Sequence, residues 1–247
     1  MRPLCFLLIS LSVSTTLSAA DHPAFPEKGD ATKGKAIFAT VCAACHGERG
    51  EGKKEIRSPS IASMPDWYVV PQLSKFKSGL RGDDPEKDPQ GHLMSAIGKT
   101  LEPEQMADVA AYVASLPQVT PGELTLPSAD LDNGQYIFQA RCMECHRYNA
   151  SGEMTFGSPP LTGRQHWYLA DQIRKFKAGT RGAKKGDEKG AKMVFTSNFI
   201  EDEEDLRDVM AYIMTLNPEP EAKASETPVK GSQTQSPFKE PSSKSSE

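Results

Sequence analysis

The chain has 247 residues, 37% of them hydrophobic, and a nearly balanced net charge of −4. This balance argues against a nucleic-acid-binding protein, which needs a basic face. The length suits two small domains followed by a tail.

The N-terminal segment has the features of a secretory signal peptide. Met1-Arg2 precedes an apolar run from Leu4 to Leu17, and Ser18-Ala19-Ala20 follows. This order predicts that residues 1–20 are removed by cleavage near Ala20 and that the protein is exported to the periplasm. A membrane anchor is the alternative, but the apolar run is too short to cross a bilayer. The mature protein is therefore expected to be soluble.

All four cysteines outside the predicted signal peptide lie in two copies of one motif. Cys-x-x-Cys-His occurs at residues 42–46 and again at residues 142–146. Two thiols at this spacing, followed by a histidine, attach a c-type haem covalently, and the histidine supplies an axial ligand to iron. The candidate cofactor-binding residues are Cys42, Cys45, His46, Cys142, Cys145 and His146.

Two other functions of a Cys-x-x-Cys pair are less consistent with this sequence. A thioredoxin-type redox pair is expected within alternating strands and helices, and neither motif has that context. A single zinc site would need ligands from motifs 100 residues apart, whereas each motif has its own histidine. We therefore predict two covalently attached haem c groups.

The two motifs belong to one domain that is present twice. Shifting the sequence by 100 residues superimposes both motifs and many other residues, which indicates an internal duplication. The coinciding residues include Gly34 and Gly134, Phe38 and Phe138, Pro59 and Pro159, Trp67-Tyr68 and Trp167-Tyr168, the segments Phe76–Gly82 and Phe176–Gly182, and Ala111-Tyr112 and Ala211-Tyr212.

The repeat and the composition predict the domain boundaries. We expect a first domain at residues 21–120, a linker at 121–128 and a second domain at 129–217. Pro117 to Ser128 contains three prolines, which is typical of a linker. Residues 218–247 have almost no apolar side chains, and we expect them to be a disordered tail.

Each copy is expected to be mainly α-helical. A first helix at about Thr32–Ala44, or Leu131–Glu144 in the second copy, carries the cysteines at its end. A second helix is predicted at about Asp66–Ser78, because its apolar residues recur near helical spacing. The last helix, at about Pro103–Ser115 or Glu203–Thr215, begins with residues suited to a helix N-terminus. Gly79 and Gly179 suit helix ends.

The second axial ligand decides whether iron transfers electrons or binds a substrate. A methionine thioether favours ferrous iron, whereas an open position admits oxygen or peroxide. Met94 and Met193 occupy similar places, each seven positions before an apolar residue and in a segment expected to be irregular. Met106 is interpreted as a packing residue of the last helix. Met64 is rejected as a ligand because it stands directly before Pro65 at the start of the second helix, on the wrong side to close the pocket. One extra residue follows Met193, since Tyr112 comes 18 positions after Met94 and Tyr212 comes 19 after Met193.

Together these motifs resemble the dihaem cytochrome c4 family over roughly residues 27–217. The resemblance rests on the repeated Cys-x-x-Cys-His, the Tyr before a Gln-containing helix, Phe-Lys-x-Gly-x-Arg, Met and the late Ala-Tyr. It implies two tandem class I cytochrome c folds, with His46 and Met94 on one iron and His146 and Met193 on the other. It also implies that the two haems face each other across the contact between the domains.

The resemblance implies further contacts. The carbonyls of Pro59 and Pro159 would accept hydrogen bonds from the ligand histidines, which fixes the orientation of the imidazoles. Gly34 and Phe38 would pack against Tyr112, and the equivalent residues of the second copy against Tyr212. The first copy departs from the pattern, since Ser60–Ser63 replaces the Pro-Leu-Thr-Gly of residues 160–163. Arg81 and Arg181 either pair with haem propionates or are solvated.

The leading functional hypothesis is a periplasmic electron carrier and not an enzyme. The family implies a quinol-oxidising complex or a dehydrogenase as donor and a terminal oxidase as acceptor. Peripheral association with a membrane is compatible with this role, and no small-molecule substrate or nucleic acid is expected. One alternative is the haem subunit of a sulfur-compound or flavoprotein dehydrogenase. A second is a dihaem peroxidase, which needs one iron with an open position.

Overall fold

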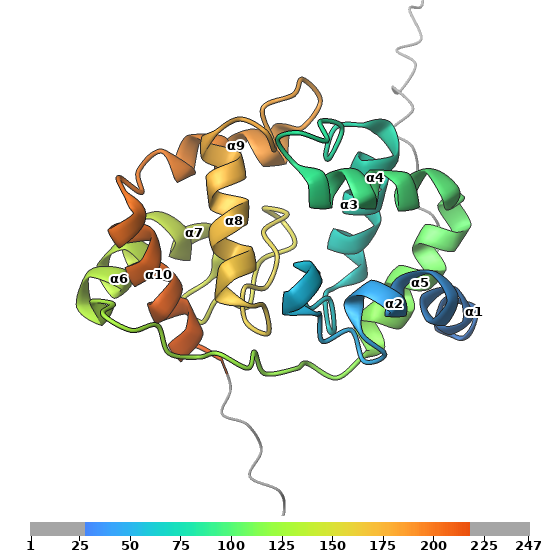
Figure 1. Ribbon diagram of the computed structural model, residues 1–247, viewed down its shortest axis with the longest axis horizontal. Helices are drawn as coiled ribbons and strands as arrows, with labels where there is room; N and C mark the ends of the chain where they lie inside the picture. Colours follow the sequence, from blue (N-terminus) through green and yellow to red (C-terminus); the bar gives the residue numbers. More distant parts are fainter. Residues whose placement is uncertain (1–27, 218–247) are drawn as a thin grey trace, which may run out of the picture. The chain divides into compact units, whose positions relative to one another are not determined.

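The computed structural model describes residues 28–217, so the predicted signal peptide and tail lie outside the described residues. Within this range two helical repeats follow one another along the chain (Figure 1). The first repeat comprises α1 (Ala31–Ile37), η1 (Phe38–Cys42), α2 (Ala43–His46), η2 (Lys54–Ile56), α3 (Asp66–Ser78), α4 (Pro89–Thr100) and α5 (Pro103–Ser115). The second comprises α6 (Leu131–Ile137), η3 (Phe138–Cys142), α7 (Met143–His146), α8 (His166–Lys177), α9 (Glu188–Ser197) and α10 (Glu203–Thr215).

The predicted mainly α fold is confirmed, and α3, α5 and α10 have the predicted ends. In residues 28–217 the β structure consists of two isolated bridges, Lys53–Ser58 and Glu153–Ser158. None of the helices in that range combines the length and the apolar character needed to cross a bilayer. Gly79 ends α3 with φ of 76°, and Gly179 has φ of 70° just after α8. Such positive φ angles are expected of glycines at helix ends.

The predicted first helix is interrupted by a π-helical segment. It begins at α1, where the Asp30 side chain caps the helix by accepting hydrogen bonds from the N–H groups of Thr32 and Lys33 at 2.8 and 3.3 Å. It then widens into η1 and continues as α2. The same sequence of α6, η3 and α7 occurs in the second repeat. Each π segment ends at the first cysteine of its motif, Cys42 or Cys142, and the second cysteine and the histidine lie on the short α-helix that follows.

The segments that carry Met94 and Met193 are helical, so the prediction that they are irregular is wrong. Asp88 caps α4 by accepting a hydrogen bond from the N–H of Gly91 at 2.8 Å, and Asp187 caps α9 by accepting from Gly190 at 2.8 Å. Three glycines in these helices weaken the sequence signal for a helix, because glycine has a low helix propensity. The methionines therefore lie on rigid elements.

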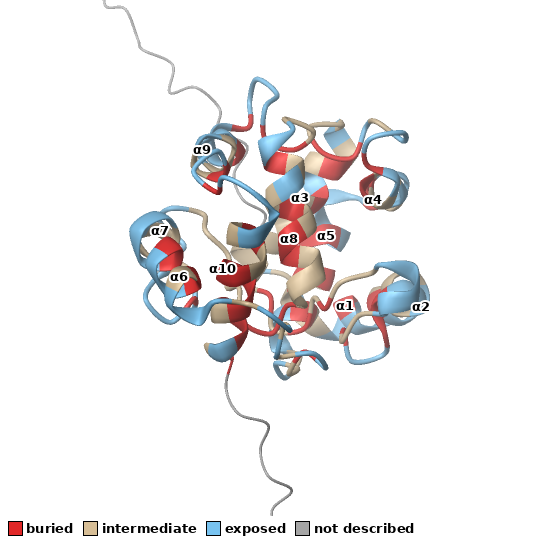
Figure 2. Cartoon of the chain, turned by 60° about the vertical axis from the view of Figure 1, so that its left-hand side comes forward, coloured by how far each residue is buried: buried red, intermediate tan, exposed pale blue. Residues whose placement is uncertain are grey.

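Each repeat has its own apolar core, to which its first and last helices contribute. A Cβ atom on Gly34 would lie 1.9 Å from the carbonyl oxygen of Asp108, so only glycine permits α1 to approach α5 this closely. The ring of Phe38 then packs edge-on against Tyr112, with centroids 5.2 Å apart. Gly134 on α6, Phe138 on η3 and Tyr212 on α10 repeat the arrangement, which confirms both expected contacts. Figure 2 shows buried residues concentrated on inner helices such as α5 and α10.

Two reciprocal ion pairs join the repeats at the helices that carry the methionines. Lys75 on α3 contacts Asp187 at 2.5 Å, and Lys175 on α8 contacts Asp88 at 2.5 Å. The two carboxylates are almost fully buried, and the same carboxylates cap α9 and α4. Each methionine helix is therefore held at its N-terminus by a lysine from the other repeat.

We expect the substitution Gly34→Ala to lower the free energy of unfolding by about 3 kcal/mol, because the added methyl group must push α1 away from α5. Gly122→Ala is the control, since a Cβ at Gly122 meets no atom within 4 Å. Urea unfolding followed by circular dichroism measures both. Equal stability of the two variants would contradict the close helix crossing.

We expect Lys175→Met to destabilise the protein by about 3 kcal/mol, because it leaves the buried Asp88 carboxylate without its cation. Lys54→Met is the matched control, since the side chains of Lys54 and its partner Glu123 are 61% and 52% exposed. Surface pairs of this kind contribute about 0–1 kcal/mol. The same unfolding experiment compares the two variants. If both lost equally little stability, the Lys175–Asp88 pair would not hold the repeats together.

Candidate haem-binding sites

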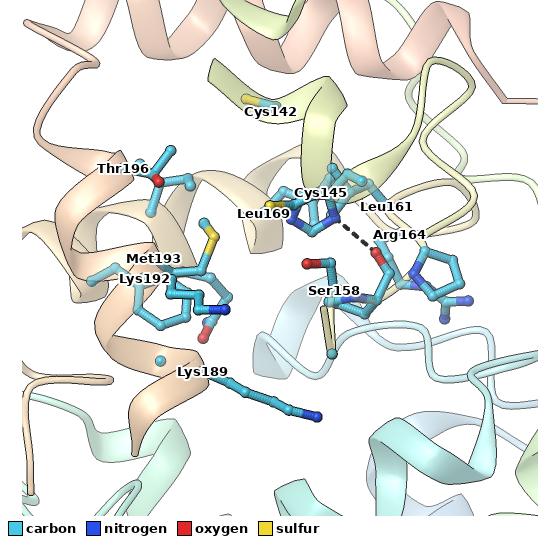
Figure 3. A pocket seen from close by; sticks show the side chains of 18 of the residues that line it. Cys142, Cys145, Ser158, Leu161, Arg164, Leu169, Lys189, Lys192, Met193 and Thr196 are labelled. Atoms are coloured by element: carbon cyan, nitrogen blue, oxygen red, sulfur yellow. Dashed lines mark hydrogen bonds between the residues drawn. The ribbon is translucent and has the colours of Figure 1, made fainter. Parts of the chain in front are cut away.

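The second repeat forms most of the wall of an apolar cavity of about 1290 Å³, including the space at its open mouth. Cys142, Cys145 and His146 line it from η3 and α7. Met193 lines it from α9 and extends into it on the side toward Cys145 (Figure 3). Apolar side chains from other elements complete the wall, among them Leu161, Leu169, Ile173, Ile200, Val209 and Ile213. The predicted ligands of the second haem thus share one cavity.

The two motif histidines are buried and oriented by a single hydrogen bond each. The Nδ1–H group of His46 donates to the carbonyl of Pro59 at 2.8 Å, and that of His146 donates to Pro159 at 2.9 Å. The expected proline contacts are therefore confirmed. Burial lowers the pKa of both histidines, so the imidazoles are neutral at pH 7. Because Nδ1 carries the proton, the lone pair of Nε2 is free to bind a metal.

The burial of the first cysteine of each motif suits a thioether. Burial raises the pKa of Cys142 to about 12 and that of Cys42 to about 11, so both thiols are uncharged at pH 7. A thioether sulfur has no charge to desolvate, so it suits these buried positions. The four cysteines of the described residues are not joined in disulfides. Thiols, imidazole, thioether and apolar walls together fit a covalently bound haem.

The first repeat contains the equivalent residues. Cys42 and Met94 pack against the same core cluster, which includes Phe38, Leu73 and Val109. Met64 belongs to this core and also lines the cavity of the second repeat.

Arg81 and Arg181 are 7% exposed, so the interpretation as solvated residues is wrong. Arg81 donates to Gln72 at 2.8 Å within its own repeat and to Gln172 at 3.0 Å in the other. Arg181 mirrors this, donating to Gln172 at 2.7 Å and to Gln72 at 3.1 Å. The two guanidinium groups also reach the hydroxyl group of the opposite repeat's tyrosine, Tyr168 or Tyr68.

These contacts relate the repeats by an approximate two-fold symmetry. Tyr68, Gln72, Tyr168, Gln172 and Arg181 line the cavity of the second repeat, so the network lies at its edge. The 100-residue repeat shows that these arginines occupy equivalent positions. It does not reveal that their hydrogen bonds join one copy to the other.

Sequence reasoning missed Arg164, the largest side chain that is fully buried in the described residues. It stands where the first repeat has Met64, and it lines the cavity of the second repeat (Figure 3). Its guanidinium donates to the carbonyls of Ser60 and Ala62 at 2.8 and 2.5 Å. Burial lowers the pKa of Arg164 to about 10, so the side chain is still a cation at neutral pH.

Comparison with known proteins agrees with this geometry. The family model for cytochrome c matches residues 31–117 and 131–217. Cytochrome c4 of Pseudomonas aeruginosa strain PAO1 is 30% identical over 186 residues, which cover 71% of this chain and 83% of that protein. The cbb3-type cytochrome c oxidase subunit FixP of Bradyrhizobium sp. strain ORS 278 is 34% identical over 156 residues, 61% of this chain and 51% of the subunit.

A solved structure gives the same result for the fold. The crystal structure of reduced recombinant cytochrome c4 from Pseudomonas stutzeri superimposes with a TM-score of 0.59 at 28% identity, and covers 75% of this chain and 98% of the other. The duplicated helical fold, the two motifs and these likenesses lead to one conclusion. The chain belongs to the dihaem cytochrome c4 family, with two tandem cytochrome c domains and two covalently attached haem c groups.

Proposed function

We propose that this c-type cytochrome is a periplasmic electron carrier in which both haem irons have histidine and methionine ligands. Cys42, Cys45, Cys142 and Cys145 form the thioethers. His46 and Met94 ligate the first iron, and His146 and Met193 the second. The observation that carries the proposal is the cavity of the second repeat, where Cys142, Cys145, His146 and Met193 line one apolar space.

The haem supplies a one-electron Fe(III)/Fe(II) couple, and the residues around it set how that couple is used. A neutral imidazole and a thioether add no charge to the site, and the thioether favours the ferrous state. Two side-chain ligands leave no position for peroxide or another substrate. The chain therefore transfers electrons and has no reaction of its own, in contrast to a dihaem peroxidase.

The partners are proposed from the family and the export signal. Residues 1–20 direct the chain to the periplasm, and residues 21–120 and 129–217 form the two haem domains. The donor is a quinol-oxidising complex or a dehydrogenase, and the acceptor is a terminal oxidase. The likeness to FixP, a subunit of a cbb3-type oxidase, supports an oxidase at the accepting end.

The ligand assignment predicts the spectra of two methionine variants. We expect Met94→Ala and Met193→Ala each to remove about half of the thioether band at the red end of the ferric spectrum, and to lower one of the two midpoint potentials, because each removes one thioether ligand. Met154→Ala is the control, since Met154 is 60% exposed. Unchanged spectra and potentials in either ligand variant would show that its assignment is wrong.

The alternatives predict different behaviour of the purified protein. Turnover of peroxide would identify a peroxidase with an open iron position. Stable co-purification with a dehydrogenase from the native periplasm would identify a haem subunit of that enzyme. An electron carrier is instead reduced by its donor and reoxidised by an oxidase-containing membrane fraction, without a lasting complex.

A further inference from the structure

The hydrogen bond that orients His46 belongs to a chain of contacts that begins in the other repeat. The carbonyl of Pro59 accepts from Nδ1–H of His46 at 2.8 Å. The N–H of Ser60, in the same peptide unit, donates to Oε1 of Gln165 at 2.8 Å. Nε2 of Gln165 in turn donates to the carbonyl of Glu51 at 2.8 Å. Only this orientation of the Gln165 amide pairs both of its ends, because the Glu51 carbonyl can only accept.

The peptide between Pro59 and Ser60 couples the two hydrogen bonds. In a trans peptide the C=O and N–H groups point in opposite directions, so bonds at both ends polarise the group in the same sense. The Gln165 oxygen therefore makes the Pro59 carbonyl a stronger acceptor. A stronger acceptor draws the Nδ1 proton and raises the basicity of the imidazole as a metal ligand.

The second repeat has no equivalent of this coupling. Pro160 follows Pro159 and has no N–H group, so nothing can donate from that peptide. The first repeat also has Pro65 where the second has Gln165, so it has no side-chain amide that could accept a hydrogen bond from the loop of the second repeat. The bond between His146 and Pro159 therefore lacks the support that His46 and Pro59 have.

Arg164 holds the same segment beside Gln165. Its guanidinium donates to the Ser60 carbonyl at 2.8 Å and to the Ala62 carbonyl at 2.5 Å. It also lies near the hydroxyls of Ser60 and Ser63, at 3.2 and 3.4 Å. The segment 60–63, which departs from the pattern of the second repeat, is the part of the first repeat that receives these two side chains. The departure has a structural function.

We propose that Gln165 is a positioning residue that acts through the Pro59–Ser60 peptide on His46, and so lowers the reduction potential of the first haem. A more basic imidazole stabilises ferric iron relative to ferrous iron, which lowers the potential. The inference rests on the proposed function, because His46 must ligate iron for the effect to reach it. The second repeat thereby controls a ligand in the first, in one direction only.

The test measures the first haem alone in the full-length holoprotein. In a Met193→Ala background the remaining ferric thioether band reports only the haem ligated by Met94. Ser60→Pro removes the N–H donor and restores the residue of the second repeat, and Gln165→Leu removes the acceptor. We expect each to shift the ratio of ferrous to ferric first haem upward about threefold at a fixed potential, which is about +30 mV for one electron.

Two further variants distinguish this coupling from a general loss of structure. Pro160→Ser, measured in a Met94→Ala background, adds an N–H group for which the first repeat has no side-chain amide as acceptor. The midpoint potential of the second haem should therefore not shift. The double variant Ser60→Pro/Gln165→Leu should shift no more than either single change, because both remove the same hydrogen bond.

The outcomes separate the inference from the proposed function. Absence of the thioether band in the Met193→Ala background would overturn the ligand assignment itself. A band that persists with an unchanged midpoint in both Ser60→Pro and Gln165→Leu would overturn the coupling. Additive shifts in the double variant, or an equal shift of the second haem in Pro160→Ser, would also overturn it.

Discussion

The hydrogen bond from histidine Nδ1–H to a proline carbonyl is the contact on which the rest of each repeat depends. It joins the end of the motif helix to a loop that returns Pro59 or Pro159 to the histidine after 13 residues. It also fixes which imidazole nitrogen is free. In the second repeat the cavity that His146 lines is also lined by Met193 on α9, and a helix capped by Asp187 holds a side chain more rigidly than a loop does.

The contact between the repeats contains a group of buried polar side chains. Arg81, Arg181 and their glutamine partners form the centre, and the lysine–aspartate pairs hold the methionine helices from the opposite repeat. Buried polar groups cost free energy unless every partner is in place, so they permit few relative positions of the two repeats. The contact therefore fixes the relative orientation of the two repeats as well as stabilising the protein.

Much of this could be predicted from the sequence. The motifs, the 100-residue repeat and the helical periodicity predicted two haem groups and three helices to the residue, and the family resemblance implied the packing of Gly34 against the last helix. The helices carrying Met94 and Met193 were missed because their glycines weaken the helix propensity. Asp88 before Pro89 and Asp187 before Glu188 are the N-cap signals that could have indicated them. Arg81, Lys75 and Arg164 could not be placed, because their partners lie in the other copy and a single repeat pattern cannot show which contacts cross.

The buried Arg164 has a consequence for how the two halves assemble. Duplication begins with identical halves, which can pair with copies of themselves as well as with each other. In this chain the two halves differ at the contact. Residues 164 and 165 of the second half bind the segment 60–63 of the first half, whose sequence the second half does not share. A pair of first halves would lack Arg164 and Gln165, and a pair of second halves would lack the segment 60–63. The contact therefore pairs one first half with one second half, and it disfavours the pairing of two identical halves.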